Sequence, residues 1–180
     1  MVTSPQGGSP DRYVVLASGG LDSIVNLHWA HKEGKVEEAI TFDYGQRAAT
    51  QEIAAARYFC EKLKISHTVV DLPFLKNLTK TALVNRDAKL PEVSNLDDFH
   101  ETSESAKCVW VPNRNGIFLN VAAAFAEAKG VPFVVPGFNR EEATTFPDNS
   151  IGFLNADTKA FSLSTLNKVQ AVCFTSSMDK

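Results

Sequence analysis

The stretch Tyr13-Val14-Val15-Leu16-Ala17-Ser18-Gly19-Gly20-Leu21-Asp22-Ser23 decides the fold of this chain. An apolar run typical of a buried strand ends at two glycines, and an amphipathic stretch from Ile24 to His31 follows at once. Glycine tolerates positive φ and has no Cβ, so backbone N–H groups in such a turn can converge on an anion. The helix that follows adds the positive end of its dipole. The sequence therefore predicts a strand, a turn and a helix that together bind phosphate.

The polar residues of this turn extend the same prediction. Ser18 and Ser23 supply hydroxyl donors. Asp22 would repel a phosphate directly, but its carboxylate can hold a Mg²⁺ that binds one. The stretch matches neither G-x-x-x-x-G-K-[ST] nor G-x-G-x-x-G, so the two most familiar phosphate-binding loops are excluded. An ordinary Gly-Gly turn between a strand and a helix is the alternative.

Composition points to one domain with a sizeable core. The chain has 180 residues, 44% of them hydrophobic and 22% charged, and a formal net charge of −3. There is no run of Lys and Arg, so we expect no nucleic-acid surface. No apolar run is long enough to span a bilayer. The three cysteines (Cys60, Cys108 and Cys173) are far apart, which predicts neither disulfides nor a self-contained zinc site and favours a reducing cytoplasm.

Strand-like and helix-like stretches alternate, which predicts an α/β fold with a parallel sheet and helices on both faces. The expected elements are strands over 12–17, 39–43, 67–71, 132–135 and 168–174, and helices over 22–33, 48–63, 115–129 and 152–164. We expect residues 1–11 to form a flexible tail and residues 12–180 a single nucleotide-binding domain. Within it, residues 72–108 show no sustained period and read as an insertion that is either functional or poorly ordered.

A second polar cluster, Phe42-Asp43-Tyr44-Gly45-Gln46-Arg47, follows the second predicted strand. Open α/β sheets bind their ligands at the carboxyl ends of the strands. A Tyr, a Gln and an Arg at that edge can stack on a base or reach a phosphate. A solvated turn is the alternative.

Further candidates lie around the alanine-rich predicted helix and the fourth strand. Arg114 carries a fork of donors suited to phosphate or carboxylate, and its neighbour Asn115 either contacts a ligand or caps the helix. Gly137 and Asn139 follow the fourth strand, again at the ligand edge. Asp148 either binds the amidine edge of a base or caps the next helix.

Taken together, these motifs resemble the 7-cyano-7-deazaguanine synthase family, the ExsB-like, QueC-type group of PP-loop ATP pyrophosphatases. That family carries SGGLDS, FDYGQR, VP-x-RN, G-x-N and a YPD-type triplet, which stand here at 18–23, 42–47, 111–115, 137–139 and 146–148. The likeness covers nearly the whole chain. It implies a Rossmann-like PP-loop domain that converts 7-carboxy-7-deazaguanine and ammonia to a nitrile with ATP, on the route to queuosine and archaeosine.

The resemblance also implies roles for particular residues. Those expected to hold ATP are Leu16, Ala17, Ser18, Gly19, Gly20, Leu21, Asp22, Ser23, Phe42, Tyr44, Gln46 and Arg47. Those expected to hold the substrate are Arg114, Asn115, Gly137, Asn139 and Asp148. Asp22 and Arg114 are the expected catalytic residues, with Asp22 also the ligand of Mg²⁺. The family further implies a cytoplasmic homodimer that acts on small molecules, without direct nucleic-acid or membrane contact.

Departures from the family pattern in two regions bear on activity. Phe146 stands where the family commonly has Tyr, and Asn149 where it commonly has Cys. The four cysteines that bind a structural zinc in the family are absent, and the chain stops at Lys180 where the family continues. We therefore expect a truncated chain that binds ATP but makes little nitrile. The alternative functions are a PP-loop enzyme that adenylates a tRNA base and a non-catalytic ATP-binding regulator.

Overall fold

The computed structural model describes residues 11–79, 81–85 and 109–179. Its centre is a sheet of five parallel strands in the order β3-β2-β1-β4-β5. The strands are β1 (Arg12–Leu16), β2 (Lys35–Asp43), β3 (His67–Asp71), β4 (Phe133–Val135) and β5 (Gln170–Ala171). The predicted tail over 1–11, apart from Asp11, and most of the predicted insertion over 72–108 lie outside the described residues, as does Cys108.

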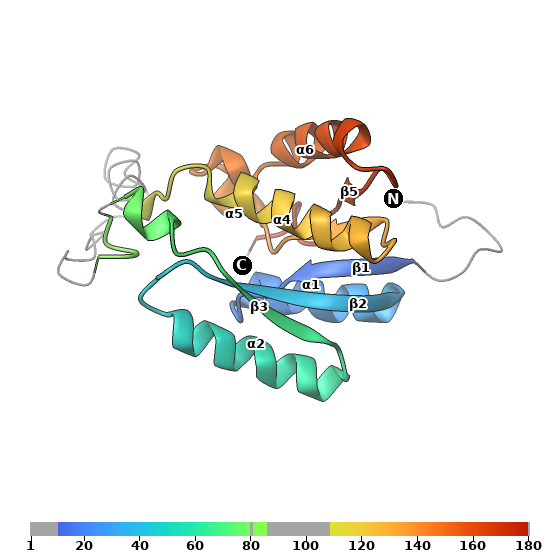
Figure 1. Cartoon of the computed structure of the whole chain (residues 1–180), viewed down its shortest axis with the longest axis horizontal. Helices are drawn as coiled ribbons and strands as arrows, with labels where there is room; N and C mark the ends of the chain where they lie inside the picture. Colours follow the sequence, from blue (N-terminus) through green and yellow to red (C-terminus); the bar gives the residue numbers. More distant parts are fainter. Residues whose placement is uncertain (1–10, 80, 86–108, 180) are drawn as a thin grey trace.

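Helices cover both faces of the sheet, which confirms the predicted fold class (Figure 1). The helices are α1 (Leu21–Glu33), α2 (Ala49–Leu63), α4 (Arg114–Ala128), α5 (Arg140–Ala143) and α6 (Ile151–Ser164), with the short 3₁₀ turns η1 (Leu75–Asn77) and η2 (Pro147–Asn149). In the view of Figure 1, α2 lies below the sheet and α4 and α6 above it, while α1 lies behind β1 and β2 and shares a core with α2. The elements α5, η1 and η2 were not predicted, because each is a single turn too short to show a period.

Two hydrophobic cores result, one on each face. Neighbouring residues of β1 point to opposite sides, so Val14 joins the core under α4 and α6 while Val15 joins the core over α1 and α2. Leu119 of α4 is fully buried in the first core and Leu27 of α1 in the second. Each such leucine contributes roughly 2–3 kcal/mol by leaving water. The two cores together fix the sheet between its helices.

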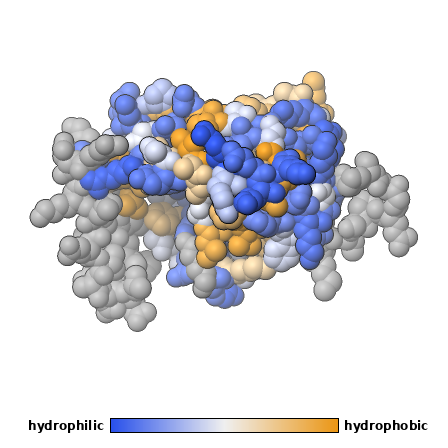
Figure 2. Space-filling view, turned by 90° about the horizontal axis from the view of Figure 1, so that it is seen from below, coloured by the Kyte–Doolittle hydropathy of each residue, from blue (hydrophilic) through white to orange (hydrophobic). Residues whose placement is uncertain are grey.

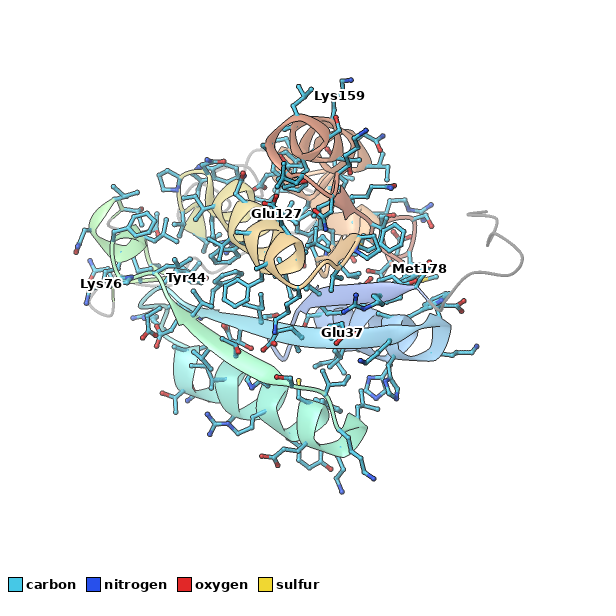
Figure 3. All side chains as sticks on the ribbon, turned by 45° about the vertical axis from the view of Figure 1, so that its right-hand side comes forward. Glu37, Tyr44, Lys76, Glu127, Lys159 and Met178 are labelled. Carbon is cyan, nitrogen blue, oxygen red and sulfur yellow. The ribbon has the colours of Figure 1, made fainter. Side chains whose placement is uncertain are left out.

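Strand β2 begins at Lys35, four residues before the predicted start. The sequence did not predict this part of the strand because its residues are largely charged. Glu37 faces the surface, where Arg12 and Lys35 each lie 2.8 Å from its Oε1. Hydrogen bonds from Lys35 and Arg12 hold the pKa of the Glu37 carboxyl below its usual range. Glu37 lies toward the amino end of β2, whereas Tyr44 lies just beyond its carboxyl end (Figure 3).

The predicted strand over 168–174 was too long, since β5 comprises only Gln170 and Ala171. Beyond β5 the chain leaves the sheet, and the fully buried Asn26 of α1 binds the segment that follows. Its Oδ1 accepts from the backbone N–H of Phe174 at 2.9 Å, and its Nδ2 donates to Thr175 Oγ1 at 2.5 Å. A side chain on a distant helix therefore holds the segment that follows β5 in place.

The outer face of the α1 and α2 layer presents mostly hydrophilic side chains, with smaller apolar areas among them (Figure 2). Within the part of the chain that the structure describes, no helix has the length and apolar character needed to cross a membrane.

Candidate active site

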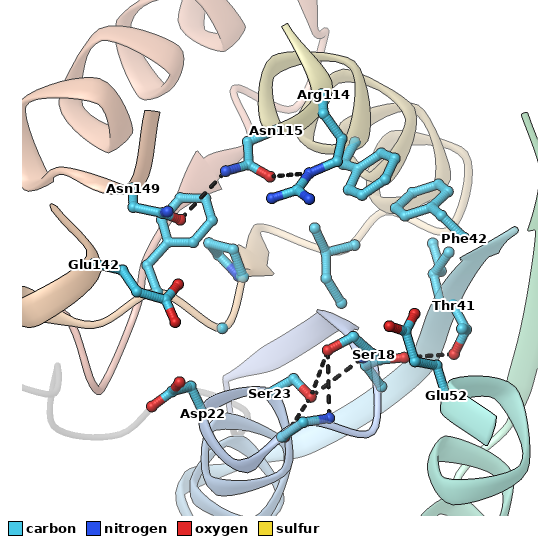
Figure 4. A pocket seen from close by; sticks show the side chains of 18 of the residues that line it. Ser18, Asp22, Ser23, Thr41, Phe42, Glu52, Arg114, Asn115, Glu142 and Asn149 are labelled. Carbon is cyan, nitrogen blue, oxygen red and sulfur yellow. Dashed lines mark hydrogen bonds between the residues drawn. The ribbon is translucent and has the colours of Figure 1, made fainter. Parts of the chain in front are cut away.

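A cavity of about 450 Å³ opens at the carboxyl ends of β1, β2 and β4 (Figure 4). This volume is typical of a small-molecule site. The cavity lies where the strand order reverses between β1 and β4, the place at which open α/β sheets bind ligands. It is lined by Leu16, Ala17, Ser18, Gly20, Leu21, Asp22, Ser23, Ile40, Thr41, Phe42, Tyr44, Glu52, Arg114, Asn115, Phe118, Pro136, Gly137, Phe138, Glu142 and Asn149.

One side of the cavity is formed by residues 18–23, which we call the phosphate turn. Ser23 Oγ donates to the carbonyl of Gly20 at 2.8 Å and accepts from the backbone N–H of Ser18 at 3.2 Å. The hydroxyl groups of Ser18 and Ser23 are 3.2 Å apart. Gly20 is the N-cap of α1, and no side chain caps this helix. The turn thus presents hydroxyl groups and a helix N-terminus to the cavity, which suits an anion.

The two glycines of the turn have different roles. Gly19 adopts φ +78°, and a Cβ there would lie 2.7 Å from the Cβ of Ala55 and 2.8 Å from the carbonyl oxygen of Glu52. Gly20 adopts φ −75°, and a Cβ there would meet only Ser18 Oγ, at 3.5 Å. Gly19 is therefore required by the fold, whereas Gly20 leaves open space at the cavity.

Asp22 and Asn139 are joined across the site. Asn139 is 1% exposed, and its Nδ2 donates to Asp22 Oδ2 at 3.0 Å. Its Oδ1 accepts from the backbone N–H of Glu142 at 2.7 Å, which caps α5. Asn139 itself is outside the cavity lining, so its contact with the site runs through Asp22. Gly137 does line the cavity and allows close approach, since a Cβ there would lie 2.7 Å from the backbone nitrogen of Ser23.

The cluster after β2 divides into two groups. Phe42 and Tyr44 line the cavity, and burial raises the pKa of the Tyr44 hydroxyl. Gln46 and Arg47 lie outside the lining. Gln46 is 3% exposed and closes the turn instead: its Oε1 accepts from the backbone N–H of Tyr44 at 3.0 Å. Its Nε2 donates to the Phe42 carbonyl at 3.0 Å and to Glu52 Oε2 at 2.8 Å, so it orients a carboxylate that does line the cavity.

The opposite side of the cavity is formed by Arg114, Asn115 and Asn149, which we call the far wall (Figure 4). Arg114 Nε donates to Asn115 Oδ1 at 3.3 Å, and Arg114 Nη1 lies 3.5 Å from the Tyr44 hydroxyl. The interpretation of Asn115 as the cap of the helix is wrong. The N-cap of α4 is Asn113, at φ +51°, and Asn115 is buried one residue inside the helix.

Asp148 does not line the cavity, although its backbone carbonyl accepts from Asn115 Nδ2 at 3.4 Å. Its Oδ1 is buried without a hydrogen-bond partner among the described residues, and burial raises the pKa of its carboxyl against the opposing charge of Arg114. The interpretation of Asp148 as a helix cap is also wrong, because the hydroxyl of Ser150 caps α6 by accepting from the backbone N–H of Phe153 at 3.1 Å.

Several lining residues were not predicted as site residues. Among them are Thr41, Glu52, Phe118, Glu142 and Asn149. Glu52 and Phe118 lie inside helices, where their spacing resembles that of any helical residue. Asn149 was noted only as a departure from the family pattern, and that departure was the one available signal.

The described part of the chain holds no cluster of three or more His, Cys, Asp or Glu residues that could bind a metal ion. Cys60 is buried in the core, where burial raises its thiol pKa to about 11. Cys173 donates to the carbonyl of Phe138 at 3.3 Å. Neither of these two cysteines therefore belongs to a cluster of metal ligands among the described residues.

Comparison with known proteins decides the family. The model described as "Queuosine biosynthesis protein QueC" matches residues 12–180. The chain belongs to the QueC family. The family predicted from the motifs is thus confirmed.

Curated relatives of this chain agree with the match. A 7-cyano-7-deazaguanine synthase from Pelotomaculum thermopropionicum is 50% identical over 171 residues, which cover 94% of this chain and 77% of that protein. A second, from Bdellovibrio bacteriovorus, is 49% identical, with coverage of 94% and 74%. A third, from Methanosarcina barkeri, is 48% identical, with coverage of 87% and 70%. These relatives are named as enzymes, which agrees with the prediction of an enzyme.

The fold of this chain is also found in a solved structure. A predicted subunit of tRNA methyltransferase from Methanocaldococcus jannaschii superposes with a TM-score of 0.53 and 15% sequence identity, covering 94% of this chain and 70% of that one. At this identity the likeness concerns the fold alone.

Proposed function

We propose that this protein converts 7-carboxy-7-deazaguanine and ammonia to 7-cyano-7-deazaguanine with ATP, as a cytoplasmic homodimer acting on small molecules. The observation that carries the proposal is one cavity with the phosphate turn on one side and Arg114 on the other, in a chain of the QueC family. The hydroxyl groups and helix N-terminus of the turn suit the polyphosphate of ATP. The guanidinium of Arg114 suits the substrate carboxylate.

The chemistry would proceed through two adenylations. A carboxylate oxygen attacks the α-phosphorus of ATP, the bond to pyrophosphate breaks, and an acyl adenylate forms. Ammonia then forms the C–N bond as AMP leaves, which gives the amide and releases a proton. The amide oxygen attacks a second ATP in the same way. Loss of the remaining nitrogen protons and of AMP leaves the nitrile.

The residues of the cavity would lower the barrier by electrostatics. Negative charge builds on the departing pyrophosphate, and the Ser18 and Ser23 hydroxyl groups with the start of α1 lie where they can stabilise it. Arg114 would hold the carboxylate in line for attack. The hydrogen bonds within the turn hold its backbone in place, and each hydroxyl group would turn from its partner in the turn to donate to the pyrophosphate.

The residues present also fit a magnesium ion. Mg²⁺ in nucleotide sites is held by one or two carboxylates together with substrate phosphates and water. Asp22 lines the cavity at the phosphate turn, and the bond from Asn139 fixes the orientation of its carboxylate. A bound Mg²⁺ would neutralise charge on the triphosphate. Asp22→Asn keeps the shape and loses the charge, so turnover should fall while the melting temperature stays nearly constant.

The test is a product assay on the purified protein. With ATP, Mg²⁺, ammonium and 7-carboxy-7-deazaguanine, we expect pyrophosphate release that depends on the acid, and the nitrile by mass spectrometry. Pyrophosphate release that requires tRNA and not the acid would instead favour the tRNA-adenylating alternative. ATP binding without any pyrophosphate release would favour the regulator.

A further inference from the structure

Asn149 supplies the cavity with a hydrogen-bond donor that no motif of the sequence assigns. It ends η2, its side chain is 6% exposed, and it lines the cavity beside Asn115 on the same side as Glu142 (Figure 4). A polar side chain that is nearly buried at a cavity wall needs hydrogen-bond partners for both ends of its amide. The orientation of that amide therefore decides what the wall can recognise.

The orientation follows from the neighbours. A guanidinium can only donate, so the atom of Asn115 that faces Arg114 Nε at 3.3 Å must be the carbonyl oxygen. The opposite end of Asn115 is then its NH₂ group, which agrees with its contact at 3.4 Å to the backbone carbonyl of Asp148, a group that only accepts. Both ends of the Asn115 amide are thus determined independently.

The same logic fixes Asn149. Asn115 Nδ2 donates to Asn149 Oδ1 at 3.2 Å, so the remaining end of Asn149 is its own NH₂ group. Within the described part of the chain, nothing accepts a hydrogen bond from this Nδ2. The relay from Arg114 through Asn115 therefore leaves a neutral donor available to a ligand in the cavity.

The chemistry of the proposed substrate offers a matching acceptor. 7-Carboxy-7-deazaguanine carries its ring keto oxygen and its carboxylate on the two carbons that flank one ring-fusion carbon, so both groups lie on the same edge. The charged guanidinium of Arg114 suits the carboxylate, because charge-assisted bonds are the stronger ones. The neutral amide of Asn149, on the same wall, suits the neutral keto oxygen. We infer that Asn149 is a specificity-determining residue that donates a hydrogen bond to the ring keto oxygen of the deazaguanine, an inference that rests on the proposed function.

The test separates this contact from a structural role. Asn149→Asp, assayed at pH 8, keeps the oxygen that accepts from Asn115 and removes the donor. We expect KM to rise about tenfold or more for both the acid and the intermediate 7-amido-7-deazaguanine, since both carry the keto oxygen. We expect kcat to change less. Asn149→Leu should raise both KM values as well, and Asn155→Asp, which places the same charge on the exposed side of α6, should leave both unchanged.

A 6-deoxo analogue of the acid gives an independent readout. The parent should bind it about tenfold more weakly than the acid in calorimetry, and Asn149→Asp should bind the two alike. A rise in KM for the acid alone would place the contact on the carboxylate and overturn the inference. Unchanged KM values with a lowered melting temperature would overturn it in favour of a purely structural role. If the parent shows no acid-dependent pyrophosphate release, the proposed function itself fails, and this inference with it.

Discussion

The two sides of the cavity are built in different ways. In the phosphate turn the serine hydroxyl groups bond to residues at most five positions away, whereas Asp22 accepts from Asn139 across 117 positions. The far wall joins Asn115 to Asn149 across 34 positions and Arg114 to Tyr44 across 70. The turn works mainly through backbone geometry, whereas the far wall works through side chains placed by tertiary packing. Substitutions at the two glycines of the turn should therefore act through shape, and substitutions in the far wall through chemistry.

The largest effect should come from Gly19→Val. The left-handed φ and the approach of Ala55 and Glu52 leave no room for a branched side chain, so the free energy of unfolding should fall by about 3 kcal/mol or more. Urea denaturation followed by circular dichroism measures it. A Gly19→Val variant as stable as the parent would contradict the claim that the phosphate turn depends on the backbone conformation of Gly19.

Gly20→Val should separate binding from folding. Its extended φ accepts any residue and a Cβ has open space, so stability should stay within about 1 kcal/mol of the parent. The side chain would stand where a phosphate must approach, and ATP affinity should fall about 100-fold or more, or about 2.7 kcal/mol. Calorimetry with ATP measures this change. Unchanged ATP affinity in a folded Gly20→Val variant would show that the phosphate turn does not bind the nucleotide.

Arg114→Lys tests the far wall through chemistry alone. Lysine keeps the charge but loses the planar fork and the bond to Asn115, so kcat/KM for the acid should fall about 30-fold with little change in melting temperature. The matched control is Arg140→Lys, whose exposed ion pair with Asp179 lies outside the cavity lining and should not affect kcat/KM. Equal effects of the two substitutions would contradict a specific role for the far wall.

The smallest effect concerns Asp157 of α6, the helix that follows η2 and Asn149. Burial raises the pKa of its carboxyl to about 6, and its Oδ2 has no hydrogen-bond partner among the described residues. A raised folded-state pKa means that the folded state binds the proton more tightly, so stability is lost as the pH rises from about 4 to 6.

Asp157→Asn should therefore stabilise the protein at pH 7.5 by about 1 kcal/mol, a value reduced for the partial exposure of the side chain, and by little at pH 4. Thermal unfolding at the two pH values gives the comparison. Equal gains in stability at the two pH values would show that ionisation of the Asp157 carboxyl does not destabilise the folded protein.

Local signals in the sequence predicted most of the fold and the phosphate turn. Alternating strands and helices indicated the parallel sheet, and the glycines with the serines indicated the anion site. Other features depend on contacts between distant residues. From the sequence, Gln46 is only a polar residue after a strand. Its hydrogen bond to Glu52 shows that it is buried in the turn after β2 and does not contact the cavity. Asp148 and Asn149 are adjacent, yet the 3₁₀ geometry of η2 brings only Asn149 to the cavity.

The buried amide of Asn26 has a consequence for how the protein is made. A ribosome releases the chain from its amino end, and domains fold as their segments emerge. Asn26 lies in the first helix, but its partners Phe174 and Thr175 come 148 and 149 residues later. During most of synthesis this amide can bond only to water or to its own helix, as in its contact with the carbonyl of Asp22 at 2.8 Å. The helix that carries the phosphate turn thus becomes fully anchored only after residue 175 has been translated.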